Sequence, residues 1–261
     1  PILLIGETGT GKTLIAETIH RISIRKERPI VFFSFNEVPE TLAESELFGY
    51  KRGAFTGAFE DKIGLIEKAN AGTIVLENIE SIPFSLQDKL LRFLDTGKIR
   101  PLGSSTEKDI DVMVIATSLP EIEEKVEKGE IRKDLFYRLK GYSLYITPLR
   151  ERKEDIPYLV DYFLEEIKER LKIKEKITLN KETWDCIYKY EWPGNVRELK
   201  YTLESAVLNL KGEKVISPLN LPEEIRKQKI EKKFLSLEEV EKNYIIEVLK
   251  STNWNKSKAA K

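Results

Sequence analysis

Short apolar runs alternate with segments of helical periodicity through the first half of the chain. The runs cover residues 1–5, 30–35, 73–76 and 112–116. Each run is too short for a helix, and most are rich in Val, Ile or Phe, as buried strands are. Between two runs, Leu86, Leu90, Leu91 and Leu94 recur at helical spacing and form one apolar stripe. This alternation predicts an α/β fold in which helices cover a parallel sheet.

The pattern from Pro148 onward is helical only. One apolar stripe follows the i, i+3, i+4 rule and consists of Ile156, Leu159, Val160, Phe163, Leu164, Ile167 and Leu171. A second helix is expected after Trp192-Pro193-Gly194, with Asn195 as its N-cap. Glu198, three residues later, would complete a capping box. We therefore expect a small α-helical lid domain over residues 148–216.

The last part of the chain has two sections of different composition. Residues 217–235 contain two prolines and a dense run of lysines and glutamates, which is typical of a linker. Apolar positions at helical spacing return over residues 236–261. Both ends of the sequence interrupt an element, so we expect a fragment of a longer protein. It would comprise an N-terminally truncated α/β domain over 1–147, the lid, the linker and a truncated C-terminal helical segment.

Composition excludes some classes of protein. The 44 basic residues balance the 44 acidic ones, so net charge argues neither for nor against a nucleic-acid partner. The single cysteine, Cys186, excludes a disulfide scaffold and fits a reducing compartment. No apolar run approaches the ~20 residues of a membrane span, and no signal peptide is visible. We therefore expect a cytoplasmic protein without a membrane partner.

The strongest chemical signal is Gly6-Glu7-Thr8-Gly9-Thr10-Gly11-Lys12-Thr13, which matches GxxxxGK[ST] at every fixed position. This P-loop follows an apolar strand and precedes a helix. Its glycines let backbone N–H groups turn toward phosphate oxygens, and the helix that starts near Lys12 adds its positive end. Lys12 is expected to reach the β- and γ-phosphates of ATP, and Thr13 to ligate Mg²⁺.

A second unusual stretch is Gly53-Ala54-Phe55-Thr56-Gly57-Ala58. Glycine is unfavourable inside strands and helices, and the stretch is too apolar for an ordinary solvated loop. We expect a flexible loop whose small residues present Phe55 and Thr56 to a partner that covers them.

Several motifs together give the chain a family resemblance. They are Glu46-Leu47-Phe48-Gly49 followed by 53–58 (ELFG…GAFTGA), 148–157 (PLRERxxDIP) and 192–199 (WPGNVREL). With the P-loop, they make the chain resemble, over nearly its whole length, the AAA+ domain of sigma-54-dependent transcription activators, the NtrC-like enhancer-binding proteins. Residues 237–261 are similar to the start of a Fis-type helix-turn-helix.

The resemblance implies a homo-oligomeric ring, a hexamer or heptamer, with ATP between subunits. Hydrolysis would move the GAFTGA loop against the sigma-54 subunit of RNA polymerase and remodel the closed promoter complex. The helix-turn-helix, most of which would lie beyond Lys261, would bind enhancer DNA.

The same resemblance assigns roles to individual residues. Arg132 and Arg138 correspond to the arginine fingers given to the next subunit. Arg197 corresponds to the sensor arginine of the lid, and Thr117 lies in the stretch that corresponds to sensor I. Asn36 corresponds to the residue that couples the nucleotide state to the loop.

The sequence departs from this family after the strand at 73–76. Glu77 stands where the family has its Mg²⁺-binding Asp, and Asn78 where it has the glutamate that activates water. An amide cannot accept a proton, so general-base assistance, typically worth ~10²–10⁴ in rate, is lost. Three interpretations remain open: hydrolysis is slow or absent, Glu77 is itself the base, or Glu80 substitutes. We favour the first.

Two functions follow from these residues. The first is an ATP-dependent activator of sigma-54 RNA polymerase, a AAA+ ATPase with impaired turnover. The alternative is a non-catalytic ATP-binding regulator that docks on sigma-54 or on other activator subunits. A P-loop enzyme with a small-molecule substrate is disfavoured, because no further acid/base pair is legible and Phe55 and Thr56 would have no role.

Overall fold

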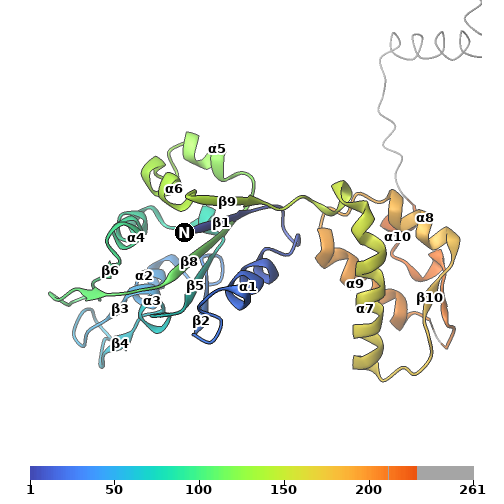
Figure 1. Cartoon of the computed structure of the whole chain (residues 1–261), viewed down its shortest axis with the longest axis horizontal. Coiled ribbons are helices and arrows are strands. Elements are labelled where there is room, and N and C mark those ends of the chain that lie inside the picture. Colours follow the sequence, from blue (N-terminus) through green and yellow to red (C-terminus); the bar gives the residue numbers. More distant parts are fainter. Residues whose placement is uncertain (211, 228–261) are drawn as a thin grey trace, which may run out of the picture.

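The computed structural model describes residues 1–210 and 212–227. Figure 1 shows an α/β lobe and a smaller helical lobe, connected by the segment that follows strand β9. The expected helix-turn-helix over 236–261 and the linker residues from 228 onward lie outside the described residues.

The α/β lobe is built on a five-stranded parallel sheet with the order β2-β5-β8-β1-β9. Its strands are β1 (Ile2–Ile5), β2 (Ile30–Ser34), β5 (Thr73–Glu77), β8 (Met113–Ser118) and β9 (Tyr142–Tyr145). Four of them lie where apolar runs predict strands, and the predicted α/β fold with a parallel sheet is confirmed. The apolar pattern does not predict β9, because this edge strand is exposed along its whole length.

Helices cover both faces of this sheet, and alternate residues of each strand enter different cores. Leu3 and Ile5 of β1 point into a large core, whereas Leu4 points into a smaller one beneath α1 (Lys12–Ile22). The helices around the large core are α2 (Glu40–Phe48), α3 (Leu65–Lys68), α4 (Phe84–Thr96), α5 (Ile122–Glu127) and α6 (Lys133–Leu139), with the 3₁₀ turn η1 (Ile79–Ser81).

Two short antiparallel hairpins extend from the α/β lobe. They are β3 (Gly49–Tyr50) with β4 (Lys62–Ile63), and β6 (Lys98–Ile99) with β7 (Lys108–Asp109). The backbone N–H of Lys51 donates to the carbonyl of Leu102 at 2.9 Å and joins the two hairpins. In Figure 1 both hairpins lie on the side of the lobe away from the helical lobe.

The helical lobe has a core of its own, which includes Trp192, Leu199 and Leu203. Its elements are α7 (Ile156–Leu171), α8 (Lys181–Lys189), α9 (Asn195–Leu208) and α10 (Glu223–Arg226), the strands β10 (Thr178–Leu179) and β11 (Val215–Ile216), and the turns η2 (Leu149–Glu151), η3 (Lys153–Asp155) and η4 (Pro218–Asn220). The lobe extends beyond the expected boundary at 216, because Leu221 and Ile225 are buried in its core.

The structure corrects the expected cap of α9. Gly194 occupies the N-cap position, and Asn195 is buried with a left-handed backbone at φ 53°. Glu198 lies four residues after Gly194, so the pair is not a capping box, but its carboxylate accepts the N–H of Gly194 at 2.7 Å. The side chain of Asn195 is therefore available for contacts outside the helix.

We expect Leu203→Ala to lower the free energy of unfolding by about 2–5 kcal/mol, because Leu203 is fully buried in the helical core. Leu208→Ala is the matched control on the same helix. Leu208 is 62% exposed, so its truncation should change stability by less than about 0.5 kcal/mol. Urea denaturation followed by tryptophan fluorescence measures both changes. Equal losses would contradict this packing.

Candidate functional site

The P-loop lies between β1 and α1, at the carboxyl edge of the sheet, where ligands of parallel sheets bind. Gly11 has a left-handed backbone at φ 102°. Gly9 is also left-handed, and a Cβ atom on it would lie 2.1 Å from the carbonyl oxygen of Gly194. Lys12 begins α1, and its Nζ donates to the carbonyls of Gly6 at 2.6 Å and Glu7 at 3.0 Å. The predicted anion site is therefore formed by the backbone that the motif requires.

Burial lowers the pKa of the Lys12 ammonium, while the nearby carboxylates of Glu80 and Glu77 oppose that change. A charge that has lost part of its hydration interacts more strongly with an opposite charge than one in bulk water does. The Lys12 ammonium is therefore suited to bind phosphate oxygens.

Thr13 and Glu77 provide a suitable pair of oxygen ligands for Mg²⁺. The hydroxyl of Thr13 donates to Oε1 of Glu77 at 2.5 Å, so the start of α1 and the end of β5 meet at one point. Mg²⁺ usually takes one or two protein ligands together with water and substrate phosphates. No cluster of three or more His, Cys, Asp or Glu side chains suited to a metal occurs within the described residues. This pair fits a nucleotide-bound Mg²⁺.

Asn78 follows Glu77 and has a left-handed backbone at φ 57°. Its N–H donates to the hydroxyl of Thr117 at 3.4 Å, and its side-chain oxygen accepts from the hydroxyl of Ser34 at the same distance. The ends of β2, β5 and β8 thus meet around one amide. Asn36, the expected coupling residue, is exposed in the turn after β2. Ser34, which the sequence did not single out, contacts Asn78. The coupling role of Asn36 stays a prediction.

Glu80 is a buried carboxylate beside this group, only 6% exposed. Its Oε2 accepts from the hydroxyl of Ser118 at 2.9 Å and from the N–H of Leu119 at 3.4 Å. The Nδ2 of Asn78 donates to its other oxygen at 3.4 Å. The carboxylate of Glu80 is therefore hydrogen-bonded to residues at the end of β8.

The two predicted finger arginines lie on and just before α6. Arg132 pairs with Asp88 at 2.6 Å and with Asp134 at 2.8 Å. Arg138 pairs with Asp95 at 3.0 Å and donates to the carbonyl of Leu94 at 2.8 Å. Figure 1 places α6 well away from the P-loop of the same chain. The structure therefore does not bring these arginines to their own nucleotide site.

The helical lobe reaches the P-loop directly. The backbone N–H of Arg197 donates to the carbonyl of Gly9 at 3.3 Å. The Arg197 side chain lines a pocket of about 400 Å³ together with Thr8 and Tyr201. Arg150 pairs with Glu7 at 2.6 Å, and the hydrogen bonds from Arg150 and Asn195 lower the pKa of Glu7 to about 2. Glu7 therefore stays ionised at neutral pH, and its side chain contacts the lid.

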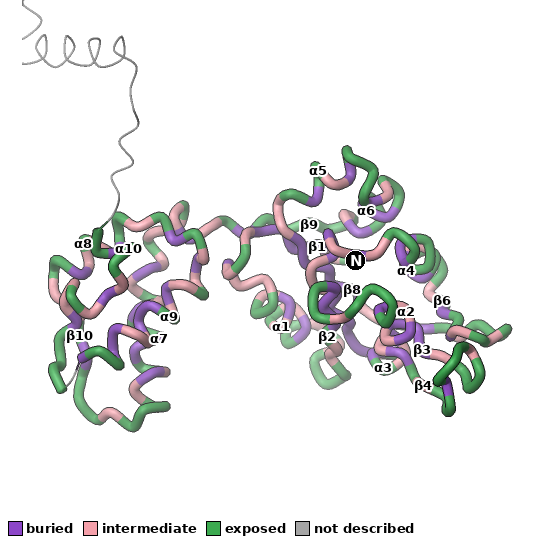
Figure 2. Tube along the Cα trace, turned by 180° about the vertical axis from the view of Figure 1, so that it is seen from behind, coloured by how far each residue is buried: buried purple, intermediate pink, exposed green. Residues whose placement is uncertain are grey.

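Most of the loop at 53–58 is exposed, as Figure 2 shows for the region beyond β3 and β4, while Ala58 is buried. Gly53 and Gly57 adopt left-handed backbones (φ 81° and 101°), and the N–H of Gly53 donates to the carbonyl of Ala58 at 2.8 Å. Phe55 is 44% exposed, and its ring packs edge-on against Tyr50 with centroids 4.9 Å apart. The glycines thus close a compact turn that presents Phe55 and Thr56.

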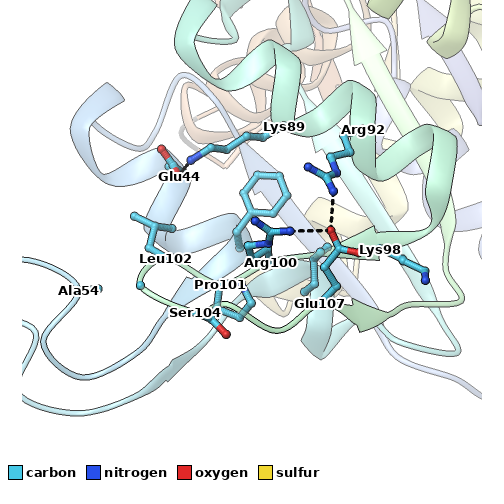
Figure 3. Close-up of a pocket in the computed structure, with 13 residues that line it drawn as sticks. Glu44, Ala54, Lys89, Arg92, Lys98, Arg100, Pro101, Leu102, Ser104 and Glu107 are labelled. Carbon is cyan, nitrogen blue, oxygen red and sulfur yellow. Dashed lines mark hydrogen bonds and ion pairs between the residues drawn. The ribbon is translucent and has the colours of Figure 1, made fainter.

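A pocket of about 590 Å³ lies beside this loop, between α2, α4 and the β6–β7 hairpin (Figure 3). Arg92 and Arg100 both pair with Glu107 there, at 2.6 and 3.0 Å. Ala54 is at its rim and lies so close to Gly103 that a Cβ atom on this glycine would be 2.8 Å from the Ala54 Cβ. The second hairpin therefore supports the base of the loop.

A parallel sheet with a P-loop and a helical lid defines a domain of the AAA+ ATPase class. Residues 1–145 match the family described as "Sigma-54 interaction domain", and residues 150–236 match "AAA+ ATPase lid domain". Residues 236–261 match "Bacterial regulatory protein, Fis family". The chain therefore belongs to the sigma-54 interaction domain family, which confirms the resemblance seen in the motifs.

Several curated relatives are transcription regulators of greater length. The chain is 42% identical over 211 residues to the regulatory protein LuxO of Vibrio cholerae, covering 81% of this chain and 40% of LuxO. It is 38% identical over 265 residues to the transcriptional regulatory protein ZraR of Salmonella typhimurium, covering 100% of this chain and 59% of ZraR. The chain thus spans less than two thirds of these relatives.

A solved structure gives the same fold. NtrX from Brucella abortus in complex with ADP has a TM-score of 0.80 and 28% identity, over 99% of this chain and 60% of NtrX.

We expect Lys12→Ala to weaken ATP binding at least about tenfold, because a hydrogen bond to a charged group contributes about 1.5–3 kcal/mol. Isothermal titration calorimetry with ATP and Mg²⁺ measures the affinity. Lys26→Ala is the control, since Lys26 is an exposed lysine outside the P-loop. Unchanged affinity in Lys12→Ala would contradict the assignment of the site.

Proposed function

We propose that this protein is a cytoplasmic, ring-forming AAA+ regulator that binds ATP and Mg²⁺ and contacts the sigma-54 subunit of RNA polymerase through residues 53–58. The family match and the exposed turn that presents Phe55 and Thr56 carry this proposal. The Fis-type match at 236–261 supports binding of enhancer DNA by the longer protein. None of the described helices has the length and apolarity needed to span a bilayer.

The positions of Arg132 and Arg138 support assembly of several subunits. Arg138 lies on α6 and Arg132 directly precedes it, and Figure 1 places this helix away from the P-loop of the same chain. An arginine that stabilises a transferring phosphoryl group must reach it, so these residues would act on the nucleotide of a neighbour. Their present partners, Asp88, Asp134 and Asp95, are exposed, and such pairs contribute little to stability. They would therefore be released at low cost on assembly.

Slow hydrolysis is the second part of the proposal. Position 78 carries an amide, and Glu77 is engaged with the Mg²⁺ ligand Thr13. Glu80 is buried, and its Oε2 already accepts hydrogen bonds from Ser118 and Leu119 rather than lying free to contact an attacking water. These contacts argue against either Glu77 or Glu80 acting as the general base in place of a glutamate at position 78. They also favour the alternative function, a non-catalytic ATP-binding regulator that docks on sigma-54 or on other activator subunits.

The double variant Glu77→Asp, Asn78→Glu tests the hydrolysis proposal. We expect it to raise the rate of phosphate release by about 10²–10⁴, the usual contribution of a general base. Steady-state release by the assembled protein measures the rate. Glu80→Gln in the native background is the control and should change little. Native turnover near or above about 1 s⁻¹, the low end of ordinary enzymes, would contradict the proposal.

Phe55→Ala tests the proposed contact with sigma-54. Truncating an aromatic anchor should weaken capture of sigma-54 at least about tenfold. Capture is measured with a transition-state mimic of ATP, and ATP affinity should be unchanged because the loop lies away from the P-loop. Phe59→Ala is the matched control, since Phe59 is 86% exposed just outside the loop. Equal capture by the native protein and Phe55→Ala would remove the loop from the interface.

A further inference from the structure

The helical lobe contacts four consecutive residues of the P-loop, Glu7 to Thr10. Arg150 donates Nη1 and Nη2 to the two carboxylate oxygens of Glu7, at 2.8 and 2.6 Å. Asn195 donates Nδ2 to the same carboxylate at 3.1 Å and to the carbonyl of Thr8 at 3.0 Å. Bidentate contacts of this kind fix geometry as well as adding energy. The name lid latch is used below for Glu7, Arg150 and Asn195.

The next two carbonyls are held in the same way. The N–H of Arg197 donates to the carbonyl of Gly9 at 3.3 Å, and Nη2 of Arg152 donates to that of Thr10 at 2.9 Å. In a planar trans peptide the carbonyl and the following N–H point in opposite directions. Donors on the lid side therefore fix the orientation of these peptide groups. Of the N–H groups that follow, that of Thr10 turns back into the loop and donates to the carbonyl of Glu7 at 3.4 Å. Successive backbone N–H groups that converge on one point form an anion site.

The backbone of Asn195 indicates that the contact between the lid and the P-loop restricts the conformation of the chain. It is fully buried, and its left-handed backbone is unusual for a residue with a side chain. Its Oδ1 accepts the N–H of Leu149 at 2.8 Å while Nδ2 serves the P-loop, so both ends of the amide are used. Backbone strain of this kind persists where the surrounding contacts require it, often at functional sites.

We propose that the lid latch consists of positioning residues that hold the P-loop in its phosphate-binding shape and make that shape depend on the orientation of the lid. This inference rests on the proposed binding of ATP, and the latch side chains bond to one another and to the backbone of the loop. The same hydrogen bonds therefore determine both the orientation of the lid and the affinity of the P-loop for phosphate.

Asn195→Ala and Arg150→Ala test the lid latch, with Glu7→Gln as a conservative variant of nearly the same shape. Each should weaken ATP binding about 5- to 100-fold, the usual size of coupling between two sites. Inorganic tripolyphosphate, which has no adenine, should lose affinity by a similar factor. The matched control is Glu166→Gln, which breaks an ion pair of the same 2.6 Å length and similar exposure within the lid. Glu166→Gln should change neither the affinity for ATP nor the affinity for tripolyphosphate.

Lid orientation provides the second readout. Nitroxide labels on Lys26→Cys and Lys181→Cys, in a Cys186→Ser background, report the distance between the lobes by electron–electron resonance. The latch variants should broaden this distance distribution, while Glu166→Gln should leave it unchanged. Circular dichroism shows whether each variant is folded. If Asn195→Ala or Arg150→Ala does not fold, Glu7→Gln still tests the lid latch.

The outcomes separate this inference from the proposed function. If the native protein does not bind ATP, the proposed function fails. If it binds ATP and the folded latch variants retain native affinity and native lobe distances, the latch alone is refuted. Loss of ATP affinity with unchanged tripolyphosphate affinity would also overturn it, because the lid would then act through the adenine.

Discussion

Burial of both faces of the central sheet determines where this protein places polar chemistry. Consecutive side chains along β1, β5 and β8 enter one core or the other, and an unpaired polar group there would be costly. Polar side chains therefore collect where the strands end, as Glu77 and Thr117 do. Because neighbouring strands are parallel, their carboxyl ends lie together, and these groups converge on the P-loop that follows β1.

The charges at this edge bear on the proposal that the site binds a nucleotide and hydrolyses it slowly. Lys12 is partly desolvated and already faces the carboxylates of Glu77 and Glu80. A third carboxylate at position 78 would supply a base, but it would also add a negative charge beside the phosphates. The side-chain amide of Asn78 would remove both effects. Its oxygen accepts from Ser34, while the backbone N–H of Asn78 donates to Thr117, so the strand ends stay connected. Under the proposed function, Asn78 would keep the framework of the site without acting as a proton acceptor.

The sequence predicts those parts of the molecule that are specified by residues adjacent to one another in the chain. The P-loop and four buried strands are of this kind, since apolar runs and the GxxxxGK[ST] pattern are contiguous. The exposed edge strand β9 has no such run. Asn195 misleads a local rule: it suits an N-cap, but its amide bonds Glu7, 188 residues earlier in the chain. Arg150 meets Glu7 across 143 residues, and only the packed lobes reveal that pair.

A chain of packed elements from the P-loop edge of the sheet to the loop at 53–58 begins at Asn78. Ser34, the residue beside Asn78, ends β2, and α2 follows after a short turn. Ala43, Leu47 and Phe48 anchor α2 in the large core, and the helix leads directly into β3 and the loop at 53–58. A packed helix moves as a unit, because close-packed interiors transmit displacement with little compression. Under the proposed function, a change at position 78 would therefore affect both proton transfer at the nucleotide and the contact from which the loop is positioned.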